Sequence, residues 1–134
     1  MTPRVLAGPL AFVAVVLASL VVLFAPASTT PSALPPGVDK AVHLALFAAL
    51  AWTGVLWIDA AAERGGDPQV ERQPGRRAGL PVVGLAAGLV VYAAGSEVLQ
   101  GLLPLGRTSD PLDAVVDVVG VALGLVAVRR PARR

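Results

Sequence analysis

The chain alternates between four long apolar runs and shorter polar segments. The apolar runs cover residues 5–25, 41–58, 79–103 and 112–128. Each is close to the roughly 20 residues that an α-helix needs to cross about 30 Å of hydrocarbon. The pattern therefore predicts an all-α fold, a four-helix transmembrane bundle in which residues 1–134 form a single membrane domain.

The first apolar run allows two interpretations. One basic residue, Arg4, precedes the run and a segment of small residues, 26–30, follows it, as in a cleaved signal peptide. However, an uncharged run of about 21 residues is longer than the roughly 7–15 apolar residues of a signal-peptide core. We therefore expect residues 5–25 to form a retained membrane anchor.

The segments between the runs are short except for one. Residues 59–78 contain four acids, four arginines, two prolines and three glycines. That composition predicts a solvated loop without a core of its own. Residues 26–38 and 104–111 are predicted to form the other two connections.

Two glycine pairs lie inside the predicted helices. Gly84 with Gly88 and Gly120 with Gly124 both match the small-xxx-small pattern that lets helices approach closely in lipid. For Gly84 and Gly88 an equally good explanation is that glycine is simply tolerated in membrane helices.

The composition supports a membrane protein. Of 134 residues, 55% are hydrophobic and 15% are charged, whereas a soluble domain has about 25% charged residues. An ordinary soluble fold is therefore excluded. The absence of cysteine also excludes disulfides, thiolate catalysis and sulfur-ligated metals.

The basic residues predict the orientation of the bundle. Nine of the eleven lie before the first run, in the 59–78 loop or in the tail: Arg4, Arg64, Arg72, Arg76, Arg77, Arg129, Arg130, Arg133 and Arg134. The positive-inside rule then places both termini and this loop in the cytoplasm, in the cytoplasmic membrane. The tail arginines could also form a nucleic-acid patch, but next to an apolar run they are better explained as an anchor, so the expected partner is the lipid bilayer and not nucleic acid.

Polar residues gather at the opposite, outer end of the last three predicted helices. They are Asp39, Lys40, His43, Glu97, Gln100, Arg107, Asp110, Asp113 and Asp117. His43, Glu97 and Asp117 each lie about four to six residues inside a helix, or roughly 6–9 Å along its axis. Ionisable groups at such depth are costly and indicate partners or function, so we expect a pocket open to the outside.

The spacing and charge of this set support a shared pocket. Intervals of three and four residues place members of each set on one helix face: Asp39 with His43, Glu97 with Gln100, and Asp110 with Asp113 and Asp117. The five carboxylates face only two fixed cations, Lys40 and Arg107. Some acids must therefore be solvated, protonated, hydrogen-bonded or bound to a cation.

These motifs resemble the VanZ-like family of membrane proteins. Residues 39–43 (DKAVH) are similar to the family's D-K-x-x-H, residues 96–100 (SEVLQ) to its S-E-x-x-Q, and residues 107–113 (RTSDPLD) to its R-x-x-D-x-x-D. Asp117 departs from the asparagine that is common in the family. The resemblance implies a link to glycopeptide resistance of the teicoplanin type and to the cell envelope, but it implies no defined biochemical activity.

Individual residues allow both chemical and structural roles. Asp39 could orient His43 as a general base, or merely cap it. Arg107 could bind a phosphate or anchor the interface beside Asp110, and Asp110 before Pro111 is best explained as a helix cap. Glu97 is the strongest functional candidate because it lies in an apolar helix.

Three functions follow from these alternatives. The first is an enzyme acting on a phosphorylated or lipid-linked envelope substrate, with His43, Glu97 and Asp113 as catalytic residues, and Asp39, Lys40, Gln100, Arg107, Asp110 and Asp117 for binding. The second is a non-catalytic factor that binds an envelope lipid or cell-wall precursor. The third, a proton or ion pathway, ranks lowest because the acids lie at one end only. A divalent metal on His43 and the carboxylates is conceivable, but one histidine with scattered acids is a weak signature, so the sequence assigns neither a metal nor a cofactor.

Overall fold

The computed structural model describes residues 3–29, 35, 37–65, 79–106 and 109–128. In this part of the chain there are four α-helices, one short 3₁₀ turn and no strand. They are α1 (Pro3–Phe24), η1 (Ala27–Thr29), α2 (Val38–Gly65), α3 (Gly79–Leu102) and α4 (Pro111–Val128). All four α-helices are long and apolar enough to cross a membrane, which confirms the predicted all-α, multi-pass fold.

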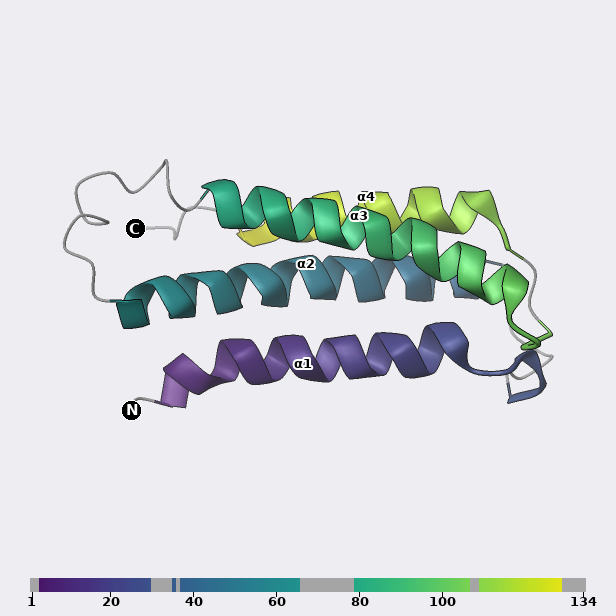
Figure 1. The fold of residues 1–134 in the computed structure, drawn as a ribbon, viewed down its shortest axis with the longest axis horizontal. Helices are drawn as coiled ribbons and strands as arrows, with labels where there is room; N and C mark the ends of the chain where they lie inside the picture. Colours follow the sequence, from purple (N-terminus) through teal and green to yellow (C-terminus); the bar gives the residue numbers. More distant parts are fainter. Residues whose placement is uncertain (1–2, 30–34, 36, 66–78, 107–108, 129–134) are drawn as a thin grey trace.

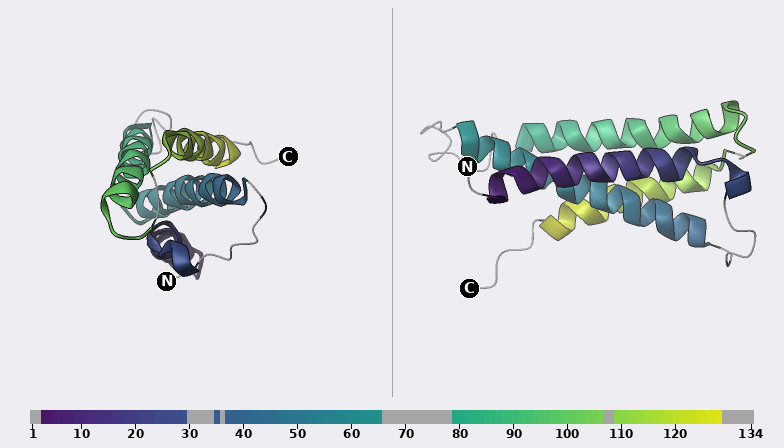
Figure 2. Two further views of the ribbon diagram at one scale, coloured as in Figure 1. Left: turned by 90° about the vertical axis from the view of Figure 1, so that its right-hand side faces the viewer. Right: turned by 90° about the horizontal axis from the view of Figure 1, so that it is seen from below.

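The four helices run alternately up and down, with α2 at the centre. Figure 1 shows α1 on one side of α2 and α3 with α4 on the other. The end-on view in Figure 2 shows α2 beside each of the other three helices. The start of α1 and the end of α4 lie at one end of the bundle. The starts of α2 and α4 and the end of α3 lie at the other, where the predicted polar residues are.

Helix α2 is longer than predicted. It continues to Gly65, so residues 59–65, which were expected to belong to a loop, form its last two turns. The sequence there, Asp59–Ala60–Ala61–Ala62–Glu63–Arg64, is rich in strong helix formers. Arg64 Nε donates a hydrogen bond to the carbonyl of Ala60 at 3.0 Å and so satisfies one of the end carbonyls. Residues 66–78 of the predicted loop lie outside the described residues.

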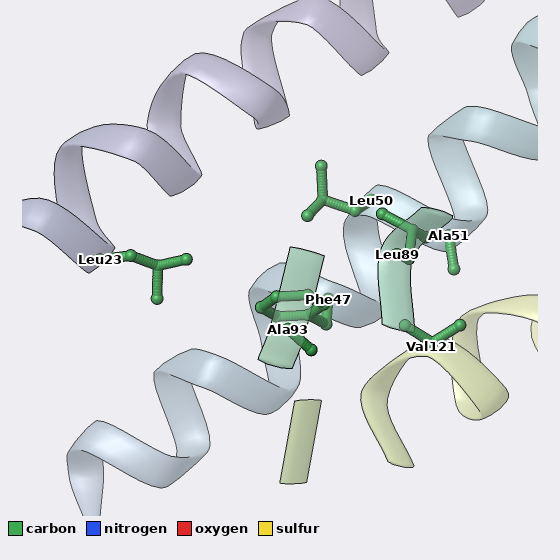
Figure 3. Close-up of a cluster of buried hydrophobic side chains, with 7 residues drawn as sticks. All are labelled: Leu23, Phe47, Leu50, Ala51, Leu89, Ala93 and Val121. Carbon is green, nitrogen blue, oxygen red and sulfur yellow. The ribbon is translucent and has the colours of Figure 1, made fainter. Parts of the chain in front are cut away.

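A small apolar core lies near the middle of the bundle, and every α-helix contributes to it. Figure 3 shows its seven buried side chains, which are Leu23 from α1, Phe47, Leu50 and Ala51 from α2, Leu89 and Ala93 from α3, and Val121 from α4. The outer faces are also apolar, as expected for surfaces in contact with lipid; Leu17, Val21, Val91 and Val126 are each more than half exposed.

The two glycine pairs differ in their surroundings. A side chain at Gly120 would lie 2.6 Å from the carbonyl oxygen of Leu44, and one at Gly124 would collide with the carbonyl oxygen of Ala48. These glycines therefore allow α4 to contact the backbone of α2, as the small-xxx-small pattern predicts. Gly84 and Gly88 face open space within 4 Å, so for this pair tolerance is the correct explanation.

Candidate functional site

The centre of the polar end is formed by one side chain from each of three helices. His43 of α2, Glu97 of α3 and Asp117 of α4 are 4%, 3% and 0% exposed. His43 Nδ1 lies 3.0 Å from Asp117 Oδ1, within hydrogen-bonding distance, and 4.0 Å from Glu97 Oε1. The prediction that these three residues reach the same depth is confirmed. We call them the His–Glu–Asp centre.

The partner of the histidine differs from the one expected from sequence. Asp39, one turn before His43, was one candidate for the carboxylate that orients the ring, with capping as the alternative, but it is exposed, whereas His43 is buried. The ring is held by Asp117, from another helix. The expectation for Asp39 is wrong because residues at an interval of four share only a broad helix face, and here the edge of the interface lies between them.

A second polar group lies beside the centre, one turn closer to the end of the bundle. Lys40 Nζ donates hydrogen bonds to Asp110 Oδ2 at 2.8 Å and to Asp113 Oδ1 at 2.6 Å. The ammonium of Lys40, together with the backbone amide of Leu112, lowers the pKa of Asp110 from its usual value. Lys40 therefore fastens the start of α2 to the start of α4.

Asp110 also begins helix α4, as predicted. Its Oδ1 accepts a hydrogen bond from the backbone N–H of Leu112 at 2.9 Å, and Pro111 occupies the first helical position. The carboxylate thus serves as helix cap and as ion-pair partner of Lys40. This confirms the structural interpretation of Asp110.

The turn between α3 and α4 is tied to the centre by its backbone. The N–H of Asp110 donates to Glu97 Oε2 at 3.0 Å, so one oxygen of Glu97 holds the turn and the other faces His43. The turn is also joined to the first connection, because the N–H of Ala27 donates to the carbonyl of Leu105 at 2.8 Å. Both contacts link the turn to neighbouring parts of the polar end.

Several buried polar atoms in this region have no hydrogen-bond partner. They are Glu97 Oε1, Asp117 Oδ2 and Gln100 Nε2. Glu97 and Gln100 share the buried face of α3, as their spacing predicts. Buried polar atoms are normally paired, so three orphaned atoms in one region point to a ligand, an ion or water as their partner.

The structure brings most of the predicted site residues together. His43, Glu97, Gln100, Asp113 and Asp117 are buried, and Lys40 and Asp110 pair at the edge. Asp39 is left outside this group. Arg107 lies outside the described residues, so its two possible roles, phosphate binding and anchoring at the interface, both stay predictions.

The polar atoms of the site stop at the apolar core. One turn below His43 lies Phe47, which is fully buried, and Val121 lies one turn below Asp117. Thr53 does not continue the path, because its hydroxyl donates to the carbonyl of Ala49 in its own helix at 2.7 Å. This arrangement closes the site on its inner side.

Sequence reasoning also missed a polar contact between the hydroxyls of Ser19 in α1 and Tyr92 in α3. The two oxygens lie 3.0 Å apart, and Ser19 is fully buried. The hydroxyl of Ser19 also donates to the carbonyl of Val16 in its own helix at 2.8 Å, as serine in a helix commonly does, so nothing in the sequence marks Ser19 and Tyr92 as partners. The contact holds α1 to α3 beside the core.

The end of the bundle remote from the site contains a different kind of hollow. A cavity of about 330 Å³ is lined by Phe12, Gly54, Trp57, Ile58, Ala61 and Leu85. None of these lining residues has a titratable side chain. Among the described residues, the buried ionisable side chains lie at the other end.

Comparison with known proteins adds no relative, because no protein-family model, curated protein or solved structure matches the chain. Inferences about function therefore depend on the site itself and on the sequence motifs.

Proposed function

We propose that this protein is a VanZ-like multi-pass protein of the cytoplasmic membrane whose polar pocket opens at the outer face. There it binds a component of the cell envelope and so alters the response to glycopeptides of the teicoplanin type. The observation that carries the proposal is the His–Glu–Asp centre: three ionisable side chains from three helices, all at least 96% buried at one end of an apolar bundle. Such groups are too costly to be retained for packing alone.

The orientation in this proposal depends on the arginines. The polar end of the bundle is the end that carries few basic residues, whereas the middle segment and the tail carry most of them. The positive-inside rule therefore favours an external polar pocket. Reporter fusions after residues 32 and 106 are expected to report outside and one after residue 73 inside, and the reverse pattern would disprove an outer pocket.

The functional test is a comparison of variants in a susceptible bacterium that expresses the chain. Glu97→Gln keeps the size of the side chain but removes its charge, and we expect it to abolish the change in teicoplanin susceptibility. Asp39→Asn is the matched control, because Asp39 is an exposed acid at the same end. Equal membrane levels of both variants must be verified by immunoblot. An unchanged phenotype in Glu97→Gln, or no phenotype for the parent chain, would disprove the proposal.

A membrane enzyme acting on a phosphorylated or lipid-linked envelope substrate is the second candidate. The contact between His43 Nδ1 and Asp117 Oδ1 favours it, since a carboxylate that holds an imidazole is the arrangement of a general base. Lys40 is less suited to binding a phosphate than the sequence implies, because two carboxylates already pair with it. Lipid and cell-wall-precursor analysis with and without the gene distinguishes the two functions, because only the enzyme changes the chemical composition.

An ion or proton pathway remains the least supported function. The apolar layer of Phe47, Leu50 and Val121 beneath the centre argues against a continuous polar route. Proton flux in reconstituted vesicles that is lost in Glu97→Gln would reverse this ranking.

A further inference from the structure

The His–Glu–Asp centre has the ligand set of a metal site. One nitrogen of His43 and one oxygen each of Glu97 and Asp117 all lie within 4.8 Å of one another. The three ligands come from α2, α3 and α4, so the cluster is produced by tertiary packing and not by an acidic stretch of one helix. Each of the three residues is more than nine-tenths buried.

A second observation points to a bound cation. Glu97 Oε1 and Asp117 Oδ2 are buried carboxylate oxygens without a hydrogen-bond partner. Carboxylate oxygens removed from water need a hydrogen-bond donor or a positive charge. The ammonium of Lys40 cannot serve both carboxylates, because two of its three donors already pair with Asp110 and Asp113. A cation between the three side chains would give these two carboxylate oxygens the partner that they lack within the protein.

We propose that His43, Glu97 and Asp117 bind one divalent transition-metal ion of the zinc class, with a further coordination position open to water or to an oxygen of a ligand. Two carboxylates and a neutral imidazole neutralise a dication, so the buried site becomes neutral as a whole. A nitrogen together with two carboxylate oxygens favours Zn²⁺ or a related ion over Ca²⁺ and Mg²⁺, which prefer oxygen ligands only.

The distances are compatible with such a site. With metal–ligand bonds of about 2.0–2.2 Å, the ligand atoms of a tetrahedral zinc site lie roughly 3.3 Å apart. His43 Nδ1 is 3.0 Å from Asp117 Oδ1 and 4.0 Å from Glu97 Oε1, so small side-chain rotations bring the three atoms into coordination. The backbone N–H of Asp110 already holds the other oxygen of Glu97, as hydrogen bonds around metal ligands commonly do.

The inference goes beyond the proposed function, because a metal site does not depend on which envelope component is bound. Its test uses the full chain purified in detergent, stripped with EDTA and titrated with Zn²⁺ alone. We expect saturable binding at one equivalent per chain. Asp117→Asn should lower the affinity on the order of 10–100-fold or more, since even loss of an outer-shell partner costs this much. The matched control, Asp39→Asn, should bind like the parent chain.

A spectroscopic measurement keeps the test decisive if Asp117→Asn is poorly folded. Co²⁺ added to the stripped parent chain should give visible d–d absorption that an equimolar amount of Zn²⁺ removes. The absence of both Zn²⁺ binding and Co²⁺ absorption in the parent chain would overturn the proposal. Equal loss of affinity in Asp39→Asn and Asp117→Asn, or full affinity retained in Asp117→Asn, would also overturn it, because the ion would then bind elsewhere.

Discussion

Helices α3 and α4 both pack against α2, but they do so in different ways. Helix α4 approaches with its backbone: Gly120 and Gly124 lie against the carbonyl oxygens of Leu44 and Ala48. Helix α3 approaches with side chains, and its glycines Gly84, Gly88 and Gly95 have open space in front of them. The same residue type therefore marks an interface in one helix and a lipid-facing surface in the other.

The difference follows from the register of each glycine with the buried acid of the same helix. Residues turn by about 100° each around an α-helix. Gly124 follows Asp117 by seven residues and so lies almost directly below it. Gly88 precedes Glu97 by nine residues and lies about halfway around the helix from it. A small-xxx-small pair thus predicts a contact where it shares the face of a buried polar residue.

The largest effect is expected from His43→Leu, which breaks the polar half of the α2–α4 contact. Asp117, fully buried, would lose the only hydrogen-bond partner that it has among the described residues. Breaking a buried pair by removal of one member costs about 3–5 kcal/mol. Unfolding in mixed micelles with increasing dodecyl sulfate measures this loss of stability in the metal-free protein.

The matching double variant sharpens this test. His43→Leu/Asp117→Leu also removes the buried acid that His43→Leu leaves without its partner, so we expect it to recover most of the lost stability. A double variant as unstable as His43→Leu would show that the histidine contributes mainly by packing. Asp39→Leu, at an exposed position, should differ from the parent by no more than about 0.5 kcal/mol.

The next largest effect is expected from Gly124→Ala, in the apolar half of the same contact. The added methyl group would collide with the backbone of α2 at Ala48, which costs about 1–3 kcal/mol. Gly88→Ala adds the same group in open space and should stay within about 0.5 kcal/mol. If the two alanine variants have the same free energy of unfolding, then α4 does not contact α2 more closely than α3 does, and the comparison is incorrect.

A smaller effect of opposite sign is expected from Gln100→Met on α3. Gln100 Nε2 is buried without a partner, so a side chain of similar length without polar atoms should raise the stability of the ligand-free protein by about 1 kcal/mol. Function should fall at the same time, as measured by teicoplanin susceptibility. If stability falls instead, the amide contributes to packing and not to binding.

The smallest effect concerns the edge of the site and depends on pH. Lys40 lowers the pKa of Asp110 from its usual 3.8, and the amide of Leu112 does so further. A group whose pKa is lower in the folded chain contributes stability above its unfolded pKa and loses it as the pH falls through the folded value. Stability should therefore decline below about pH 3.8, and less steeply in Asp110→Asn, as followed by helical circular dichroism. Asp113, the other carboxylate that pairs with Lys40, is present in both proteins, so the two curves differ only by residue 110. Identical acid curves would contradict the assignment.

The sequence is sufficient for the number of helices and for most of the site. Long apolar runs predict membrane helices directly, because the hydrocarbon core imposes both length and composition. An ionisable residue several positions inside such a run is conspicuous, which is why Glu97 and Asp117 could be identified without coordinates. Their common depth follows from counting residues from the helix ends.

Partners across helices could not be predicted in the same way. The pairing of His43 with Asp117, and not with Asp39, depends on how α2 and α4 are rotated and shifted relative to each other. The contact of Ser19 with Tyr92 depends on the place that α1 takes beside α3. The extra turns of α2 were missed for another reason: charged residues ended the apolar run, whereas the helix ends only after Arg64.

The hydrogen bond from Asp110 to Glu97 comes from the main chain, and this affects how the protein can vary. Every amino acid except proline brings the same N–H to position 110. The cap on α4 can also be supplied by asparagine, serine or threonine. Natural variation or a mutagenesis library could therefore change the residue at this turn while the buried acid keeps its position. Proline is the one replacement that would release Glu97.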